Sequence, residues 1–208
     1  MPFDMGFNYR SSAGYVTDGP EGVPVLGETY PHTYTNGNGD SINAGWSGSL
    51  PATYDHASGN DPRLAGSNVI YAFAGGQKTF TVDLSSGSAP GAGNYIVDLA
   101  LWGATWETVD DHVWLYDDTT LLLDASNGGS GYKLASNHWV DATLADVTAT
   151  TSWTGTTAPF TYATTTAKLV AGGEGIGFYT QVAHFRLTLG AAQSVVPVLM
   201  AQYRQRRG

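Results

Sequence analysis

The chain has 208 residues, 27 of them glycine and none cysteine, a formal net charge of −9, and a charged fraction of 13%. This length suits one domain of the size that all-β sandwiches reach. The absence of cysteine excludes disulfides, thiolate metal sites and cysteine nucleophiles. Few charges combined with many Thr, Tyr, Trp and Gly favour half-buried strands and tight turns, and no stretch shows the stripe of a long amphipathic helix.

The charge is divided unevenly along the chain. Residues 1–203 contain six basic and eighteen acidic residues, a net charge of −12, and the other three arginines lie within the last five residues. An acidic body repels phosphate backbones, so no nucleic-acid partner is expected. No stretch approaches the ~20 apolar residues of a membrane span. Residues 1–10 lack the pattern of a signal peptide, so neither a membrane span nor signal-peptide export is expected.

The first 68 residues are rich in Pro and Gly, which predicts short strands and long ordered loops that wrap a sandwich. Within them, Asn36-Gly37-Asn38-Gly39-Asp40 places oxygen-bearing side chains at alternate positions, as calcium loops do, but without the closing Glu. The acidic pairs Asp110-Asp111 and Asp117-Asp118 are weaker candidates. We therefore expect no cofactor, with calcium left open as the alternative. The five histidines show no zinc-site spacing.

Period-two alternation predicts strands further along the chain. Thr79–Leu84 and Tyr95–Leu101 each alternate apolar and polar residues, and the Gly-, Ser- and Pro-rich segment Ser85–Asn94 predicts a hairpin loop between them. Val113–Tyr116 and Thr119–Leu123 flank Asp117-Asp118 and predict a second hairpin. The core residues expected from the clearest strands are Phe80, Val82, Leu84, Val97, Leu99, Leu101, Phe185 and Leu187.

The last predicted strand is Ala183–Leu189, paired with Ile176–Tyr179. Its alternation places Ala183, Phe185, Leu187 and Leu189 toward the core and His184, Arg186 and Thr188 outward. Together the segments predict an all-β, two-sheet antiparallel jelly-roll β-sandwich over residues 1–190. Residues 191–208, AAQSVVPVLMAQYRQRRG, are apolar and then basic, and they predict a short C-terminal docking tail. Pro197 suits the start of a short helix there, and a frayed tail is the alternative.

Several strand motifs carry a family resemblance over about residues 3–189. In chain order they are Phe3-Asp4-Met5-Gly6, Gly14-Tyr15, Gly45-Trp46, Arg63, Thr79–Leu84, Tyr95–Gly103 and Ala183–Leu189. This series resembles galactose-binding-like jelly rolls, in particular the malectin-like and carbohydrate-binding modules attached to polysaccharide lyases and hydrolases. The resemblance implies a sandwich whose loop after the Tyr95 strand lies at the ligand-holding tip, and it matches Arg63 to a basic residue that braces loops there.

The loop from Trp102 to His112 is the candidate glycan site. Trp106 is the expected stacking platform, and Asp110 or Asp111 the expected acceptor for sugar hydroxyls. The predicted ligand-binding residues are Trp102, Trp106, Asp110, Asp111, His112 and Arg63. The alternative makes Trp102 and Trp106 lids over the end of the core.

No catalytic constellation is evident in the sequence. The chain has four Glu, and the one dense acidic cluster lies in a single loop, whereas a glycosidase needs two carboxylates opposed across a cleft. Gly45-Trp46-Ser47-Gly48-Ser49 misses the nucleophile-elbow pattern at its last residue. We therefore expect no enzymatic activity.

The expected function is that of a surface-displayed structural protein of a phage virion, a capsid decoration or a tail or fibre component. Release by cell lysis would explain a sugar-binding type of fold without an export signal. The alternative is a carbohydrate-binding module of a secreted polysaccharide-degrading enzyme. The expected location is the virion surface or the extracellular space, and the partners are other virion subunits or further copies of the chain, with glycans as additional candidates. The expected assembly contacts lie in the tail: Val195, Val196, Val198, Leu199, Met200, Tyr203, Arg204, Arg206 and Arg207.

Overall fold

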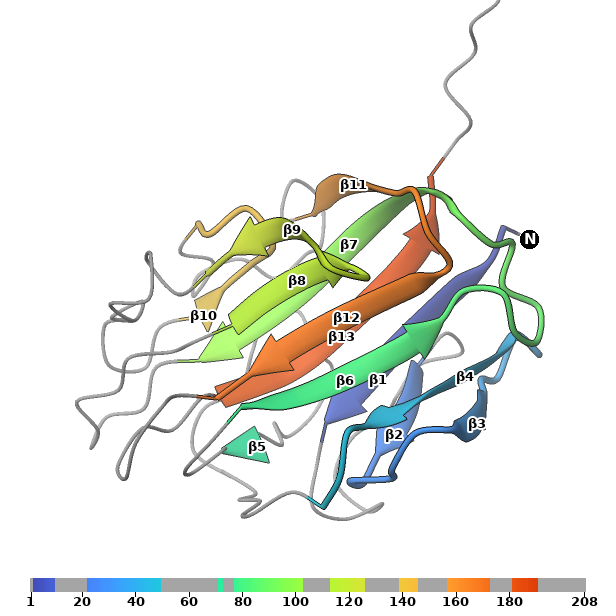
Figure 1. Cartoon of the computed structure of the whole chain (residues 1–208), viewed down its shortest axis with the longest axis horizontal. Helices are drawn as coiled ribbons and strands as arrows, with labels where there is room; N and C mark the ends of the chain where they lie inside the picture. The colour runs from blue at the N-terminus through green and yellow to red at the C-terminus, as the bar shows by residue number, and fades with distance from the viewer. Residues whose placement is uncertain are drawn as a thin grey trace, which may run out of the picture.

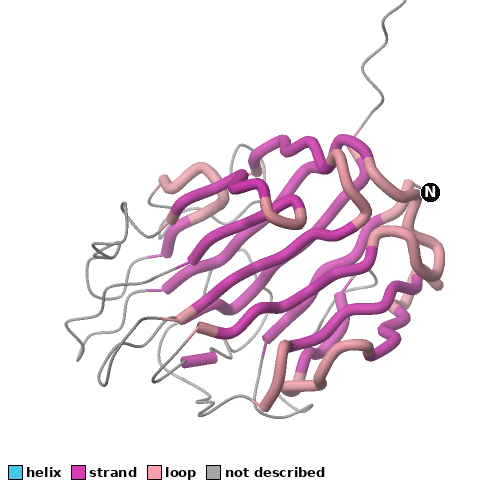
Figure 2. Tube along the Cα trace, viewed as in Figure 1, coloured by secondary structure: helices cyan, strands magenta, loops and turns pink. Residues whose placement is uncertain are grey.

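The structure, a computed structural model, describes residues 2–9, 22–49, 71–72, 77–102, 113–125, 139–145, 157–172 and 181–190. Within these ranges the chain forms strands and turns and no helix, which confirms the predicted all-β class (Figure 2). The strands, in chain order, are β1 Asp4–Tyr9, β2 Gly22–Val25, β3 His32–Thr35, β4 Ser41–Trp46, β5 Tyr71–Ala72, β6 Lys78–Asp83, β7 Gly93–Trp102, β8 Val113–Asp117, β9 Thr120–Asp124, β10 Trp139–Val140, β11 Ala158–Tyr162, β12 Thr166–Ala171 and β13 Gln181–Leu189.

The strands form two sheets that pack face to face (Figure 1). The seven-stranded sheet has the order β10-β7-β13-β1-β2, with β11 also paired to β7 and β5 to β13. The six-stranded sheet has the order β3-β4-β6-β12-β8-β9. The chain crosses between the sheets from β6 to β7 to β8 and from β11 to β12 to β13, as in a jelly roll. The predicted two-sheet sandwich is confirmed, with the parallel pair β1–β2 as an exception to antiparallel order.

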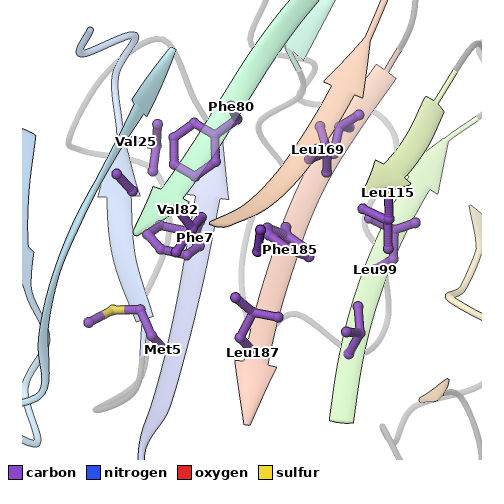
Figure 3. Packing of buried hydrophobic residues seen from close by; sticks show 14 of the residues in the cluster. Met5, Phe7, Val25, Phe80, Val82, Leu99, Leu115, Leu169, Phe185 and Leu187 are labelled. Atoms are coloured by element: carbon purple, nitrogen blue, oxygen red, sulfur yellow. The ribbon is translucent and has the colours of Figure 1, made fainter. Parts of the chain in front are cut away.

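The predicted core is confirmed. All eight residues expected from the alternating strands have 0% of their surface exposed. Figure 3 shows Phe80 and Val82 of one sheet lying against Phe7 of the other. The Phe7 and Phe80 rings meet edge to face with centroids 5.0 Å apart, a favourable aromatic geometry. Interlocking side chains from both sheets therefore hold the sandwich together.

The segment Ser85–Asn94 is not the hairpin loop that its composition predicts. It joins β6 of the six-stranded sheet to β7 of the seven-stranded sheet, so it is a crossover. The segment is fastened to the start of β4, where the Ser88 N–H donates to the Ser41 carbonyl (2.9 Å). Gly87 takes a left-handed φ of 58°, and a Cβ there would overlap the Ser41 carbonyl. Turn residues mark where a strand ends but do not specify which sheet the next strand joins.

The hairpin around Asp117-Asp118 is confirmed. β8 and β9 pair antiparallel through a short turn in which Asp118 has a φ of 50°. Asp tolerates this left-handed conformation better than most residues. The Asp118 carboxylate also forms an ion pair with Lys168 on β12, with Nζ 2.7 Å from Oδ1.

The prediction that the first 68 residues only wrap the sandwich is wrong for β1 and β4. β1 lies inside the seven-stranded sheet between β13 and β2, and β4 lies inside the six-stranded sheet between β3 and β6. Met5, Phe7 and Trp46 are fully buried. The predicted strand Ile176–Tyr179 lies outside the described residues.

Candidate functional site

The predicted glycan loop begins where β7 ends. The backbone of Trp102, the last residue of β7, pairs with that of Trp139 on β10. The other predicted ligand residues, Trp106, Asp110, Asp111, His112 and Arg63, lie outside the described residues, as do the tail residues 191–208. The structure therefore fixes where the loop after Trp102 and the tail after Gly190 leave the sandwich.

They leave it at opposite ends. β7 and β13 are antiparallel neighbours in which Leu101 pairs with Val182 and Tyr95 pairs with Leu189. The chain after Trp102 therefore departs from one end of the seven-stranded sheet, and the chain after Leu189 departs from the other (Figure 1). The nine residues of β13 correspond to a separation of about 30 Å at the ordinary rise of an antiparallel strand.

A charged cluster lies on the outer face of the seven-stranded sheet, between the two ends. Arg186 on β13 donates from Nε and Nη2 to the two carboxylate oxygens of Asp4 on β1, at 2.7 and 2.6 Å. Thr188 donates its hydroxyl to the same carboxylate at 3.1 Å. Arg186 Nη1 also lies 3.9 Å from Oδ2 of Asp98 on β7. This forked geometry ties three neighbouring strands together with one guanidinium group.

His184 lies on the outer face, as the alternation predicts, but the residue is only 4% exposed. Its Nδ1 lies 2.6 Å from Oδ1 of Asn8, itself buried. A Cβ on Gly6 would lie 3.1 Å from His184 Cε1, so this glycine leaves the room that the imidazole ring occupies. Period two predicts the faces of residues 184–188 correctly but not whether the outer face is exposed. It is wrong for Ala183, because a bulge between Val182 and His184 brings Val182 into the core cluster instead.

Sequence reasoning missed this cluster as a unit because its members come from strands far apart in the chain. One signal was available: the alternation of Asp4, Gly6 and Asn8 against Met5, Phe7 and Tyr9 marks β1 as a strand with a polar outer face. The carboxylates of the cluster lie around a cation that the protein itself supplies. The arrangement therefore cross-links strands and provides no opposed acid–base pair.

The loop considered for calcium is a hydrogen-bonded turn. Asn36 Oδ1 accepts from the N–H groups of Asn38 and Asp40, at 3.0 and 2.9 Å, and Asn36 Nδ2 donates to the Asp4 carbonyl at 2.7 Å. Asp40 Oδ2 accepts from the Asp4 N–H at 3.2 Å. Such Asx bonding explains the Asn- and Gly-rich sequence as turn chemistry. In the part of the chain that the structure describes, no three His, Asp or Glu side chains gather as metal ligands would.

Asp117 is a buried carboxylate that fixes the turn between β11 and β12. Its oxygens accept from the Ala163 N–H (2.7 Å), the Thr164 N–H (3.0 Å) and the Thr164 hydroxyl. Burial by itself raises the pKa of Asp117, but these hydrogen bonds lower it by more, and the net pKa lies below the ordinary value of 3.8. Burial, with a smaller contribution from the Asp117 charge, raises the pKa of the nearby Tyr162 hydroxyl. The Asp117 carboxylate therefore caps the β11–β12 turn and has a structural role.

A pocket of about 450 Å³ lies beside the point where β13 ends. It is lined by residues of β7 and β11 and by the residue after β13: Asn94, Tyr95, Ile96, Pro159, Phe160, Thr161 and Gly190. Of its polar side chains, Thr161 donates to Asn94 Oδ1 at 2.6 Å, and Tyr95 donates to the Gly91 carbonyl at 2.7 Å. Burial raises the pKa of Tyr95 to about 12. The pocket lining contains no carboxylate, histidine or cation.

A scan of protein-family models and a search of curated proteins found no match to this chain. The resemblance to galactose-binding-like modules therefore rests on the sequence motifs and stays a prediction. Among the described residues there is no helix long and apolar enough to cross a membrane.

Proposed function

We propose that this chain is a non-enzymatic structural protein displayed on a phage virion, as a capsid decoration or a tail or fibre component. Residues 191–208 would attach the sandwich to the particle, and the loop after Trp102 would face outward. The observation that carries the proposal is the antiparallel pairing of β7 and β13, which separates the two exits by about 30 Å. A displayed domain needs its attachment and its contact surface on opposite sides.

The role of the carboxylates in the described residues supports a scaffold over an enzyme. Seven of these carboxylates bind the protein's own backbone, hydroxyl groups or cations, and none of the seven opposes another across a cleft. Their partners are Arg186 for Asp4, the Asp4 N–H for Asp40, Ser85 for Asp83, Thr164 for Asp117, Lys168 for Asp118, Thr143 for Asp141 and Tyr34 for Glu28.

The charge distribution supports attachment through the tail. The segment Val195–Met200 is apolar, and Arg204, Arg206 and Arg207 follow it, whereas residues 1–203 carry a net charge of −12. Burying several aliphatic side chains gives about 1.5–3 kcal/mol each at most, enough to anchor a short segment after ordering costs. The arginines would then lie against acidic surface of a neighbouring subunit.

Deleting residues 194–208 tests the attachment. The expected product is a folded sandwich, judged by circular dichroism and thermal unfolding, that no longer incorporates into particles. Trp106→Ala is the matched control, since it lies in the loop assigned to the opposite end and should leave incorporation unchanged. A truncated protein that incorporates normally, or one that unfolds outright, contradicts the anchoring role.

A carbohydrate-binding module is the second candidate. It is favoured by the position of Trp102 at the end of β7, because the loop that follows then starts from the tip of the sandwich. In that case Trp106→Ala should abolish retention on a glycan surface while changing the free energy of unfolding by less than about 1 kcal/mol, and the tail deletion should leave retention intact. A large loss of stability in Trp106→Ala would place this tryptophan in the core.

A further inference from the structure

We propose that the pocket beside Gly190 binds the apolar tail segment Val195–Met200 of a second copy of this chain, and that two copies exchange their tails. The inference rests on the proposed function in that it takes the tail as an assembly element. It goes further by naming the receiving surface and the partner.

The pocket suits an apolar occupant. The Thr161 hydroxyl is bonded to the Asn94 side chain at 2.6 Å, and the Asn94 carbonyl accepts the Gly190 N–H at 2.9 Å. These hydrogen bonds engage part of the polar lining, and Ile96, Pro159 and Phe160 contribute apolar surface. The volume of about 450 Å³ is that of an ordinary binding pocket and has room for several aliphatic side chains.

Docking by side chains fits this sheet edge better than addition of a strand. In the described residues β11 pairs with β7 on one side only, so its other side is an edge. Pro159 lacks an N–H group. In an edge strand the missing N–H lies on the outer side, where it interrupts the hydrogen bonds that an added strand would form. The apolar side chains, and not the backbone, are then what the edge offers.

The direction of the chain favours a second copy over the chain's own tail. Ile96 pairs with Thr188, so the pocket lies beside the last residues of β13 and behind the exit of the chain. Gly190 does not adopt the left-handed backbone of a reversing turn. At its last described residue the chain therefore continues in the direction of β13, away from Ile96.

A twofold arrangement satisfies both copies at once. Because the exit and the pocket adjoin, two sandwiches placed pocket to pocket can each send a tail into the other. The four linking residues, 191–194, span about 13–14 Å when extended. Such an interface is closed and uses the same surface on both copies. Arg204, Arg206 and Arg207 then fall on the partner, whose residues 1–203 have a net charge of −12.

The test uses full-length chains and molar mass in solution, measured by light scattering across a concentration series. Ile96→Asp and the exposed Pro159→Asp each place a charge in the pocket, and Leu199→Asp places one in the tail. Each variant alone should raise the dimer dissociation constant by about 100-fold or more, since an unpaired charge is costly in an apolar site. Thr81→Asp, on the outer face of the other sheet, is the control and should dimerise like the unchanged protein.

Mixing separates exchange between copies from docking within one chain. Ile96→Asp keeps its tail, and Leu199→Asp keeps its pocket, so exchange predicts a one-to-one complex when the two are combined, although each alone is monomeric. If the mixture stays monomeric, or if the unchanged protein is monomeric throughout, the inference is overturned. Should the tail still be required for incorporation into particles in that case, the proposed function survives. A dimer that never enters a particle supports the inference and contradicts the proposed function.

Discussion

Asp117→Asn removes one negative charge from a buried site while keeping the size of the side chain. The carboxylate accepts three hydrogen bonds from the β11–β12 turn, two of them from backbone N–H groups at 2.7 and 3.0 Å. An amide offers one accepting oxygen, so at least one donor would face an NH₂ group. Hydrogen bonds to a charged group contribute about 1.5–3 kcal/mol each. Because one such bond is lost and the others weaken, the free energy of unfolding should fall by about 2–3 kcal/mol.

For a protein of this size, that change lowers the melting temperature by about 4–12 °C. Urea unfolding at neutral pH gives the free energy directly, and the dependence on urea should keep its slope. Asp118→Asn is the matched control. That side chain is 48% exposed, and its ion pair with Lys168 is open to solvent. Asn also tolerates the φ of 50° at this position, so a change of no more than about 1 kcal/mol is expected.

The pH dependence of the free energy of unfolding tests whether the Asp117 charge causes this difference. The pKa of Asp117 is lower in the folded protein than its ordinary value of 3.8. Its carboxylate therefore stabilises the fold at pH values above the unfolded pKa, and this contribution is lost as the pH falls through the folded pKa. Asn does not titrate, so the stability gap between the two proteins should be constant near neutral pH and narrow below about pH 4. A gap that is absent at neutral pH, or that stays constant into acid, refutes the reasoning.

Four further substitutions have defined outcomes in urea unfolding. Gly87→Ala should lower the free energy of unfolding by more than about 2 kcal/mol, because its Cβ would overlap the Ser41 carbonyl. Gly39→Ala is the control, at positive φ but with open space around it, and should lower it by about 1 kcal/mol. Equal losses would show that the Ser85–Asn94 crossover shifts to accommodate the Cβ. Tyr162→Phe should leave stability unchanged or raise it by about 1 kcal/mol, since the buried hydroxyl has no hydrogen-bond partner in the described part of the chain; a clear loss would reveal one. Arg186→Met should cost about 2 kcal/mol by removing the cation between two carboxylates, and a neutral result would mean that packing alone joins those strands.

The strands that could be predicted from sequence are those with a complete apolar alternation between turn residues. β6, β7 and β13 meet that condition, and all their predicted core residues in the eight-residue set are buried. β1 was predicted only through the family motif Phe3-Asp4-Met5-Gly6 and not as an internal strand of a sheet, because its short run lies among turn-rich residues. Residue composition could not predict the crossover at Ser85–Asn94, since which sheet a strand joins depends on contacts distant in sequence.

The candidate site was predictable only in part for the same reason. Local alternation predicts a strand over Tyr95–Leu101, and in the structure β7 extends one residue further, to Trp102, which was predicted to begin the loop. The Asp4–Arg186–Asp98 cluster joins residues from three strands, and no local spacing in the sequence predicts it. The pocket beside Gly190 likewise arises from two strands and a chain end that meet only after folding.

The position of β13 has a consequence for how the chain reaches its folded state. β13 is the last described strand in sequence, yet it lies between β7 and β1 in the seven-stranded sheet, where its Phe185 pairs with Phe7 of β1. Before residues 181–189 leave the ribosome, β1 and β7 have no described strand between them, and both present open edges that can pair with other chains. Because β13 pairs with strands distant in sequence, we expect slow folding, and we expect chains that stop before β13 to be prone to aggregation.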